Sequence, residues 1–197
     1  ASIDESANKA PGMAAIIGLE TEVIIEMLKD YSGENGIVFP VNMNSPKQTV
    51  VAGTAKGLEL CENLCKEKGA RRFIRLQVAG PFHSPLMKDA AEKFETFLQD
   101  FDFQNPKIPF YSNVTGSEIT TGKEAKEAAV KHITHPVLWT KEEKEIAAFF
   151  EKSASESLLL EVGPGKVLSG LWRDSGYSES ITSIPCGTLE PIQLLSK

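Results

Sequence analysis

Cysteine is scarce in this sequence, with three in 197 residues: Cys61, Cys65 and Cys186. An odd number at unrelated spacings excludes the disulfide framework of a small secreted domain. Cys61 and Cys65 lie four residues apart, on one face of a predicted helix, and no histidine is near them in the sequence, so no metal site is expected. We interpret both as small core residues, and this cysteine usage fits a reduced, intracellular compartment.

Long apolar runs and an excess of positive charge are also missing. No segment approaches the ~20 apolar residues of a membrane-spanning helix, so no membrane partner is expected. Asp and Glu number 27 against 21 Lys and Arg, a net charge of −6. This balance argues against a nucleic-acid partner, because such binding needs a basic face.

No targeting signal is evident at the start, ASIDESANKAPGM, which has no basic region followed by an apolar one. No signal peptide is therefore expected. The sequence also opens without an initiator Met, which allows a processed or excised piece. The cytosol is the default compartment, and a plastid or a mitochondrion stays open because a transit peptide would precede Ala1.

What is present is the composition of an ordinary globular protein, with 41% hydrophobic and 24% charged residues. The length predicts one domain, or one core with a smaller appendage. The hydrophobic pattern over residues 13–78 predicts the order β-α-β-β-α-β, with Thr21 and Thr54 placed to cap the two helices. This order is that of the ferredoxin-like split βαβ unit, so we predict a ferredoxin-like subdomain over 13–78. The predicted strands cover 13–19, 37–44, 49–52 and 73–78.

Residues 79–197 form the second predicted part. Helices alternate there with short apolar strands, which indicates an α/β layered core. A long helix is expected to begin at Ser84 or Asp89, and the apolar run SLLLEV predicts a buried strand over 157–162. The turn Gly163–Pro164–Gly165 follows it and leads into a helix over 166–172. Its helix N-terminus could face an anion, although the spacing is not that of a phosphate-binding loop.

His83 is the candidate functional residue that the pattern itself singles out. It lies in Gly80-Pro81-Phe82-His83-Ser84-Pro85, between a predicted strand and a predicted helix. Such junctions lie at the end of a sheet, where α/β folds place their sites, and an imidazole can act there as general base and acid. A loop histidine that only hydrogen-bonds to backbone fits the same local sequence. No Gly-x-Ser-x-Gly nucleophile elbow occurs anywhere in the chain.

Seven short segments occur in an order that resembles the malonyl-CoA:acyl carrier protein transacylase family. They are GMAAIIGL, NMNSPKQTVVAG, VAGPFHSPLM, PFYSNVTG, HPVLW, LEVGPGKVL and IPCGT, and they cover nearly the whole chain. The resemblance implies transfer of a malonyl group from coenzyme A to acyl carrier protein, through a malonyl-serine ester, in fatty acid synthesis. It implies malonyl-CoA and acyl carrier protein as partners and no cofactor beyond the thioester substrate. The implied fold is a hydrolase-like α/β core, with its latter part over 79–197, and an inserted ferredoxin-like subdomain.

The same resemblance assigns roles to three residues. His83 matches the catalytic histidine, which takes the proton from the serine and returns it to the leaving thiol. Phe82 matches the position for substrate specificity, where a bulky ring fills the space that an α-methyl group would need. In the family a backbone carbonyl orients the histidine, and His132 occupies that position in place of the usual Gln.

The chain also departs from the family pattern. Its 197 residues contain no Gly-His-Ser-Leu-Gly elbow, and nothing in them matches the arginine that pairs with the malonyl carboxylate or the glutamine of the oxyanion hole. The chain therefore resembles the back portion of the enzyme, and we expect it to be inactive alone. Two alternatives stay open: a malonyl-selective acyltransferase of polyketide synthesis, or a non-catalytic fragment that binds carrier protein or coenzyme A.

Overall fold

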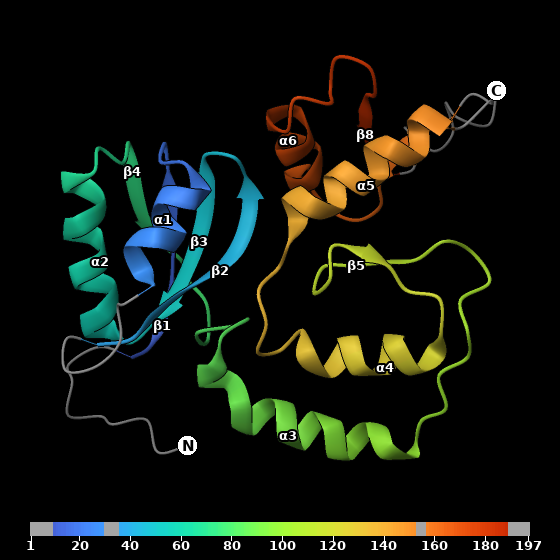
Figure 1. Cartoon of the computed structure of the whole chain (residues 1–197), viewed down its shortest axis with the longest axis horizontal. Helices are drawn as coiled ribbons and strands as arrows, with labels where there is room; N and C mark the ends of the chain where they lie inside the picture. Colours follow the sequence, from blue (N-terminus) through green and yellow to red (C-terminus); the bar gives the residue numbers. More distant parts are fainter. Residues whose placement is uncertain (1–9, 30–35, 153–156, 189–197) are drawn as a thin grey trace. The chain divides into compact units, whose positions relative to one another are not determined.

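The computed structural model describes residues 10–29, 36–152 and 157–188. It divides into two compact units, the first extending to Trp139 and the second starting at Thr140 (Figure 1). Helices and strands occur in both units, so the α/β class expected from the sequence is confirmed. The boundary predicted between residues 78 and 79 does not coincide with this division, and it stays a prediction.

The first unit opens with a four-stranded antiparallel sheet and two helices. Along the chain the elements are β1 (Gly12–Ile17), α1 (Thr21–Leu28), β2 (Val38–Ser45), β3 (Gln48–Gly53), α2 (Ala55–Glu67) and β4 (Arg72–Arg75). This is the order that the hydrophobic pattern predicts. In the sheet the strands lie in the order β2-β3-β1-β4, so β1 is central and pairs antiparallel with both β3 and β4.

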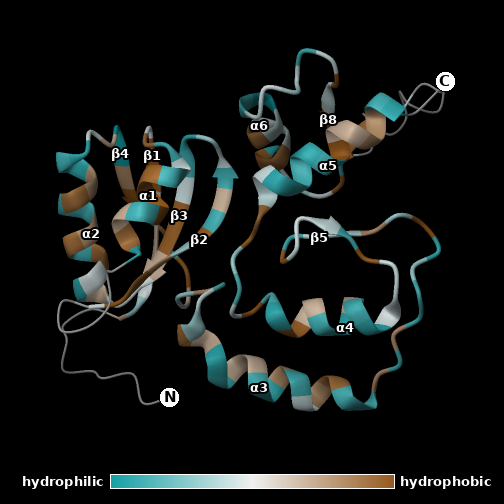
Figure 2. Ribbon diagram, viewed as in Figure 1, coloured by the Kyte–Doolittle hydropathy of each residue, from teal (hydrophilic) through white to brown (hydrophobic). Residues whose placement is uncertain are grey.

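The two faces of this sheet bury two separate apolar clusters, because side chains alternate along β1. Ala14 and Ile16 point to one face, which α1 and α2 cover, and Met13 and Ala15 point to the other. Figure 2 shows the hydrophobic residues gathered in the sheet and in α2. The cluster under the helices includes Ile24, Leu28, Val38, Val51, Leu58, Cys61 and Cys65.

Cys61 and Cys65 are both fully buried in that cluster, with their Sγ atoms 3.9 Å apart. The hydrogen bond with Cys65 and, second, burial raise the pKa of the Cys61 thiol. A thiol that stays protonated is a poor nucleophile and a poor metal ligand. The prediction that the two are core residues is confirmed.

Thr21 does not have the capping role that the sequence predicts. Helix α1 begins at Thr21 itself, after Glu20, and no side-chain cap is formed there. The Thr21 hydroxyl instead donates to the Ser45 carbonyl at 3.2 Å and lies 2.8 Å from the Thr49 hydroxyl. All three residues are buried, so this contact between α1 and the β2–β3 hairpin outcompetes local capping. Thr54 does cap α2, accepting from the Gly57 N–H at 3.2 Å.

The rest of the first unit is mainly helical. The predicted long helix is divided into a 3-10 turn, η1 (Pro85–Met87), then α3 (Lys88–Phe97) and a second 3-10 turn, η2 (Leu98–Asp100). A short hairpin follows, β5 (Tyr111–Ser112) and β6 (Ser117–Glu118), and then α4 (Gly122–Lys131), which begins with a Thr121–Glu124 capping box.

The segment after α4 is anchored to β2. The Val137 N–H donates to the Val41 carbonyl at 2.8 Å, and the Val137 carbonyl accepts from the Met43 N–H at 3.0 Å. The Leu138 N–H donates to the Asn113 carbonyl at 2.8 Å. The two Val137 bonds join the segment after α4 to the sheet, and the Leu138 bond joins it to the turn between β5 and β6. They therefore help to position the end of α4.

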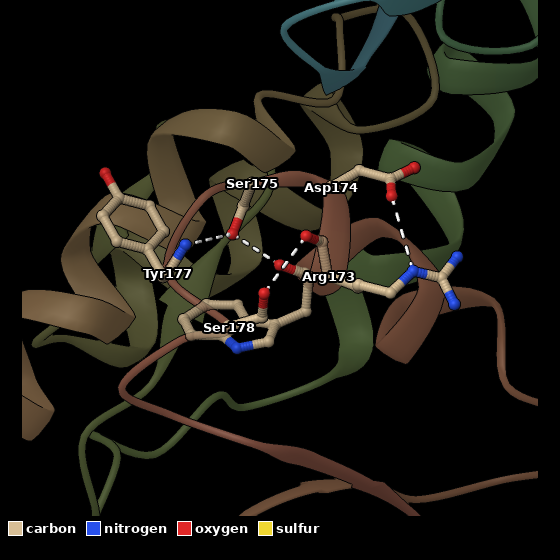
Figure 3. A network of polar contacts seen from close by, with 6 residues as sticks. Arg173, Asp174, Ser175, Tyr177 and Ser178 are labelled. Carbon is tan, nitrogen blue, oxygen red and sulfur yellow. Dashed lines mark hydrogen bonds and ion pairs between the residues drawn. The ribbon is translucent and has the colours of Figure 1, made fainter.

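The second unit contains α5 (Trp139–Lys152) from its second residue onward, and then β7 (Leu159–Glu161), α6 (Val167–Asp174) and β8 (Ser183–Pro185). The strands β7 and β8 pair in parallel. The end of α6 is closed by hydroxyl contacts: the Ser175 hydroxyl donates to the Trp172 carbonyl at 2.6 Å, and the Ser178 hydroxyl donates to the Arg173 carbonyl at 3.2 Å (Figure 3). None of the helices in the described residues is long and apolar enough to cross a membrane.

Two sequence expectations for the second unit need correction or refinement. The segment SLLLEV is not a buried strand. The strand is limited to Leu159–Glu161, where Leu160 is 39% exposed, and the flanking Leu158 and Val162 are 58% and 84% exposed. Within the described residues this strand pairs with β8 alone. The anion at the N-terminus of α6 belongs to the chain itself. The Glu161 carboxylate accepts from the Leu168 and Ser169 N–H groups at 3.0 and 2.8 Å.

Candidate active site

His83 lies in the loop between β4 and η1, in an unusual backbone conformation. Among the described residues it is the one non-glycine with a positive φ, 59°. Its N–H donates to the Ile133 carbonyl at 3.1 Å, and the buried Ser84 hydroxyl donates to the Pro81 carbonyl at 2.5 Å. Left-handed backbone costs free energy outside glycine and is concentrated at functional sites, so this strain marks His83 independently of any motif.

The His83 ring is oriented by the end of α4. Its Nδ1 lies 2.7 Å from the carbonyl oxygen of His132, 49 residues further along the chain. His132 is the C-cap residue of α4, where carbonyl groups lack partners within the helix. A carbonyl oxygen can only accept, so Nδ1 must carry the proton, and the neutral ring presents the lone pair of Nε2. A ring in this tautomer can accept a proton at Nε2.

A pocket of about 510 Å³ adjoins His83, within the range of small-molecule sites. Its walls are mainly apolar and come from β2, η1 and the segment after α4, with Lys88 and His135 adding polar groups. The lining residues are Phe39, Pro40, His83, Pro85, Lys88, Thr134, His135 and Pro136. No serine or cysteine is among them, so this part of the chain offers a base but no strong nucleophile beside it.

The side chain of His132 also meets His83. The two ring centroids are 4.7 Å apart and the ring planes differ by 35°. The His132 Nε2 is buried without a hydrogen-bond partner among the described residues. Burial and, second, the charge of His83 lower the pKa of His132. The ring is therefore uncharged at neutral pH, because a lowered pKa favours the neutral form above it.

The sequence-predicted residues are brought together only in part. His83 and His132 are in contact, whereas Phe82, next to His83, is exposed and does not line the pocket. Sequence reasoning did not single out Lys88 or His135, which do line it. The sequence did contain a signal for both residues. His135 begins HPVLW, a segment that carries the family resemblance, and Lys88 directly follows another, VAGPFHSPLM. In the described residues no group of three or more His, Cys, Asp or Glu side chains could hold a metal ion.

The backbone strain at His83 can be measured with two substitutions. His83→Ala and His83→Gly both remove the hydrogen bond to the His132 carbonyl, but only Gly adopts the positive φ without strain. We expect the Gly variant to be the more stable by about 1 kcal/mol, as the free energy of unfolding in urea. Equal midpoints at equal slope would mean that the native backbone at this position is not left-handed.

Comparison with known proteins gives the chain its relatives. No family model matches it. A malonyl CoA-acyl carrier protein transacylase of Bacillus subtilis is 40% identical over 159 residues, which is 81% of this chain and 49% of that protein. The protein of the same description from Haemophilus influenzae is 42% identical over 161 residues, again 81% and 49% of the two chains.

Solved structures agree with these relatives. An acyl carrier protein S-malonyltransferase from Vibrio cholerae superposes with a TM-score of 0.84 at 34% identity, over 94% of this chain and 58% of that one. A malonyl-transacylase solved in complex with a type II polyketide synthase acyl carrier protein also gives a TM-score of 0.84, at 33% identity, over 95% and 58% of the two chains.

These similarities relate the chain to acyltransferases that work with carrier proteins. More narrowly, the resemblance to the malonyl-CoA:acyl carrier protein transacylase family, predicted from the seven motifs, is confirmed. The chain spans about half the length of the curated relatives that it matches.

Proposed function

We propose that this chain carries the histidine-bearing portion of a malonyl-CoA:acyl carrier protein transacylase of fatty acid synthesis. The observation that carries the proposal is the contact between His83 Nδ1 and the His132 carbonyl, which leaves Nε2 free to accept a proton in a chain about 40% identical to such enzymes. The catalytic role of His83, the orienting role of the His132 carbonyl and the specificity role of Phe82 are parts of this proposal.

The chemistry follows from that tautomer. Nε2 of His83 removes the proton of a serine hydroxyl while the serine oxygen attacks the thioester carbonyl of malonyl-CoA. The C–S bond then breaks, the proton returns to the thiolate of coenzyme A, and a malonyl-serine ester remains. The thiol on the arm of acyl carrier protein attacks that ester in the same way, and the serine regains its proton. The serine is not among these 197 residues, and the substrate thioester needs no further cofactor.

The domain assignment is part of the same proposal. The four-stranded unit with the order β1-α1-β2-β3-α2-β4 would be the ferredoxin-like subdomain over 13–78. Residues 79–197 would supply the latter part of a hydrolase-like core, for which the parallel pairing of β7 with β8 is supporting evidence. Parallel strands joined through a helix are the building unit of such cores.

Acyl carrier protein is the proposed macromolecular partner, as in the complex that the polyketide relative forms. Acyl carrier proteins are acidic, and opposite charges speed encounter. Arg71 and Arg72 are exposed where β4 begins and offer such a surface. A malonyl-selective role in polyketide synthesis stays the second candidate, because that relative is similar to the same extent as the others.

The proposal is tested by supplying the missing nucleophile. The front part of the Bacillus subtilis relative, which this chain does not match, is coexpressed with the chain and assayed with malonyl-CoA and acyl carrier protein. We expect malonyl transfer, reduced by ~10²–10⁴-fold in His83→Ala because general-base assistance is lost. Lys93→Ala, at an exposed position of α3 outside the pocket lining, is the control and should retain transfer. A folded complex whose transfer is indifferent to His83 would contradict the proposal.

Substitution of Phe82 tests the proposed selectivity. Phe82 is exposed in this chain and does not line the pocket beside His83, so its proposed role requires the front part of the enzyme to complete the acyl pocket against it. In the reconstituted enzyme Phe82→Ser should then raise methylmalonyl transfer relative to malonyl transfer, because the smaller side chain leaves room for an α-methyl group. One methyl group is worth only ~1–3 kcal/mol in a pocket, so the ratio of the two kcat/KM values should change by ~10–200-fold at most. A ratio that does not move would mean that Phe82 does not line the acyl pocket.

A further inference from the structure

The His83–His132 ring contact is a feature that the proposed mechanism does not use. The mechanism needs only the backbone carbonyl of His132, which any residue provides. Yet the His132 ring lies 4.7 Å from the His83 ring, centroid to centroid, and its Nε2 is buried with no partner in the described part of the chain. A buried polar atom without a partner costs free energy, so the ring calls for an explanation beyond its main chain.

The electrostatic surroundings of His132 are simple. Burial and the charge of His83 lower its pKa. Of the other charged or titratable groups on α3, on α4 and in the turn after α4, Lys126 is half-buried. The rest are exposed: Lys88, Asp89, Glu92, Lys93, Glu95, Lys123, Glu124, Glu127, Lys131 and His135. Lys88 is paired with Glu92 at 3.5 Å, and His135 Nδ1 lies 3.0 Å from the Lys131 carbonyl. His83 is thus the neighbour whose charge lowers the pKa of His132, and the two rings meet at a half-buried contact.

We propose that the His132 side chain is a positioning residue for His83. Its uncharged ring packs against the His83 ring, keeps that ring in the orientation in which Nδ1 donates to the His132 carbonyl, and allows one proton on the pair but not two. The positioning role of His132 rests on the proposed function, because it assumes that the orientation of His83 matters for proton transfer. The ring contact and the shared proton do not rest on it.

The physical reason is that a flat neutral ring can both pack and tolerate a charge. A hydrogen bond to one carbonyl leaves the His83 side chain, on its left-handed backbone, free to change rotamer. Packing against a second ring restricts it to one rotamer. A neutral aromatic face also attracts a cation, so it favours His83 when that ring carries the serine proton. A second proton would place two like charges within a partly buried pair, which is unfavourable.

The first test is an NMR titration of the 197-residue chain labelled in histidine, which has only three histidines. Val162→Lys and Val167→Lys, both at exposed positions of the second unit, are included in every sample to keep the chain soluble. In the wild-type chain His132 should titrate below the ordinary range of histidine. In His83→Gln its midpoint should move up towards that range, because the neighbouring charge is gone. His135→Gln is the matched control and should leave the His132 midpoint in place. An unchanged midpoint in His83→Gln would overturn the shared-proton part of the proposal.

The second test separates the ring from the carbonyl. The Nδ1–H proton of His83 should exchange slowly in the wild-type chain, and the slow signal should be lost in His132→Ala, which keeps the carbonyl but removes the ring. His132→Phe keeps a flat ring of similar size and should restore it. Retention of the signal in His132→Ala would show that the carbonyl alone positions His83. If His132→Ala does not fold, loss of the slow signal in folded His132→Phe would overturn the packing role.

Discussion

Incubated with labelled malonyl-CoA, the 197-residue chain by itself is expected to gain no malonyl ester. Covalent transfer needs a nucleophile, and no serine of the family elbow is present. In the proposed mechanism His83 moves a proton at Nε2 and forms no ester, so it does not replace the serine. Triad residues act as a unit, so an enzyme without its nucleophile retains at most ~10³–10⁴-fold acceleration over water. The family resemblance implies that the oxyanion-hole glutamine and the carboxylate-binding arginine are missing from this chain as well.

Mass spectrometry of the intact chain, followed by peptide mapping, checks this expectation. The matched control is the same chain coexpressed with the front part of the Bacillus subtilis relative, where the ester should form on the supplied half. A stable malonyl ester on a serine of this chain, absent in His83→Ala, would show that the nucleophile is here and that its assignment to a missing segment is wrong.

The second large effect concerns the apolar surface of the second unit. Leu158, Val162 and Val167 are 58%, 84% and 71% exposed, and Leu168 is 43% exposed. Large apolar side chains exposed to water promote association when they gather in a patch. We expect the chain alone to bind a hydrophobic dye strongly and to be poorly soluble, and Val162→Lys with Val167→Lys to raise the soluble fraction several-fold.

The control for this experiment is Leu171→Lys, on the same helix as Val167 but buried at 8% exposure. That substitution places a charge inside the unit and should lower solubility, because the charge is not compensated. Coexpression with the front part of the relative should reduce dye binding if that part covers the patch. Equal solubility of all the variants would mean that the exposed residues are not responsible.

The sequence by itself determined the local structure of the first unit. Short apolar runs predict β1, β2 and β3, alternation predicts β4, and the spacing of Leu58 and Cys61 predicts α2, because each pattern reflects which faces of the element are buried. Thr54 at the start of α2 is a local signal and was correct. The capping role predicted for Thr21 was wrong, because its hydroxyl instead contacts the Ser45 carbonyl and the Thr49 hydroxyl, 24 and 28 residues away in the sequence.

The solvent exposure of SLLLEV could not be predicted from the sequence either. A run of apolar residues reports what a strand can bury, not whether another element is present to cover it. In the structure β7 pairs with β8 alone among the described residues, and Val162 is largely exposed. Burial is a property of the partner as much as of the strand, and a single segment does not contain that information.

The site divides in the same way. The sequence placed His83 at a strand-to-helix junction, and the family resemblance assigned its role and pointed to His132. Only the tertiary structure decided that the end of α4 meets that loop, that Nδ1 faces the His132 carbonyl at 2.7 Å, and that the two rings pack together. The β2 contacts of Val137 fix this arrangement, because backbone hydrogen bonds between distant segments set positions that no local pattern specifies.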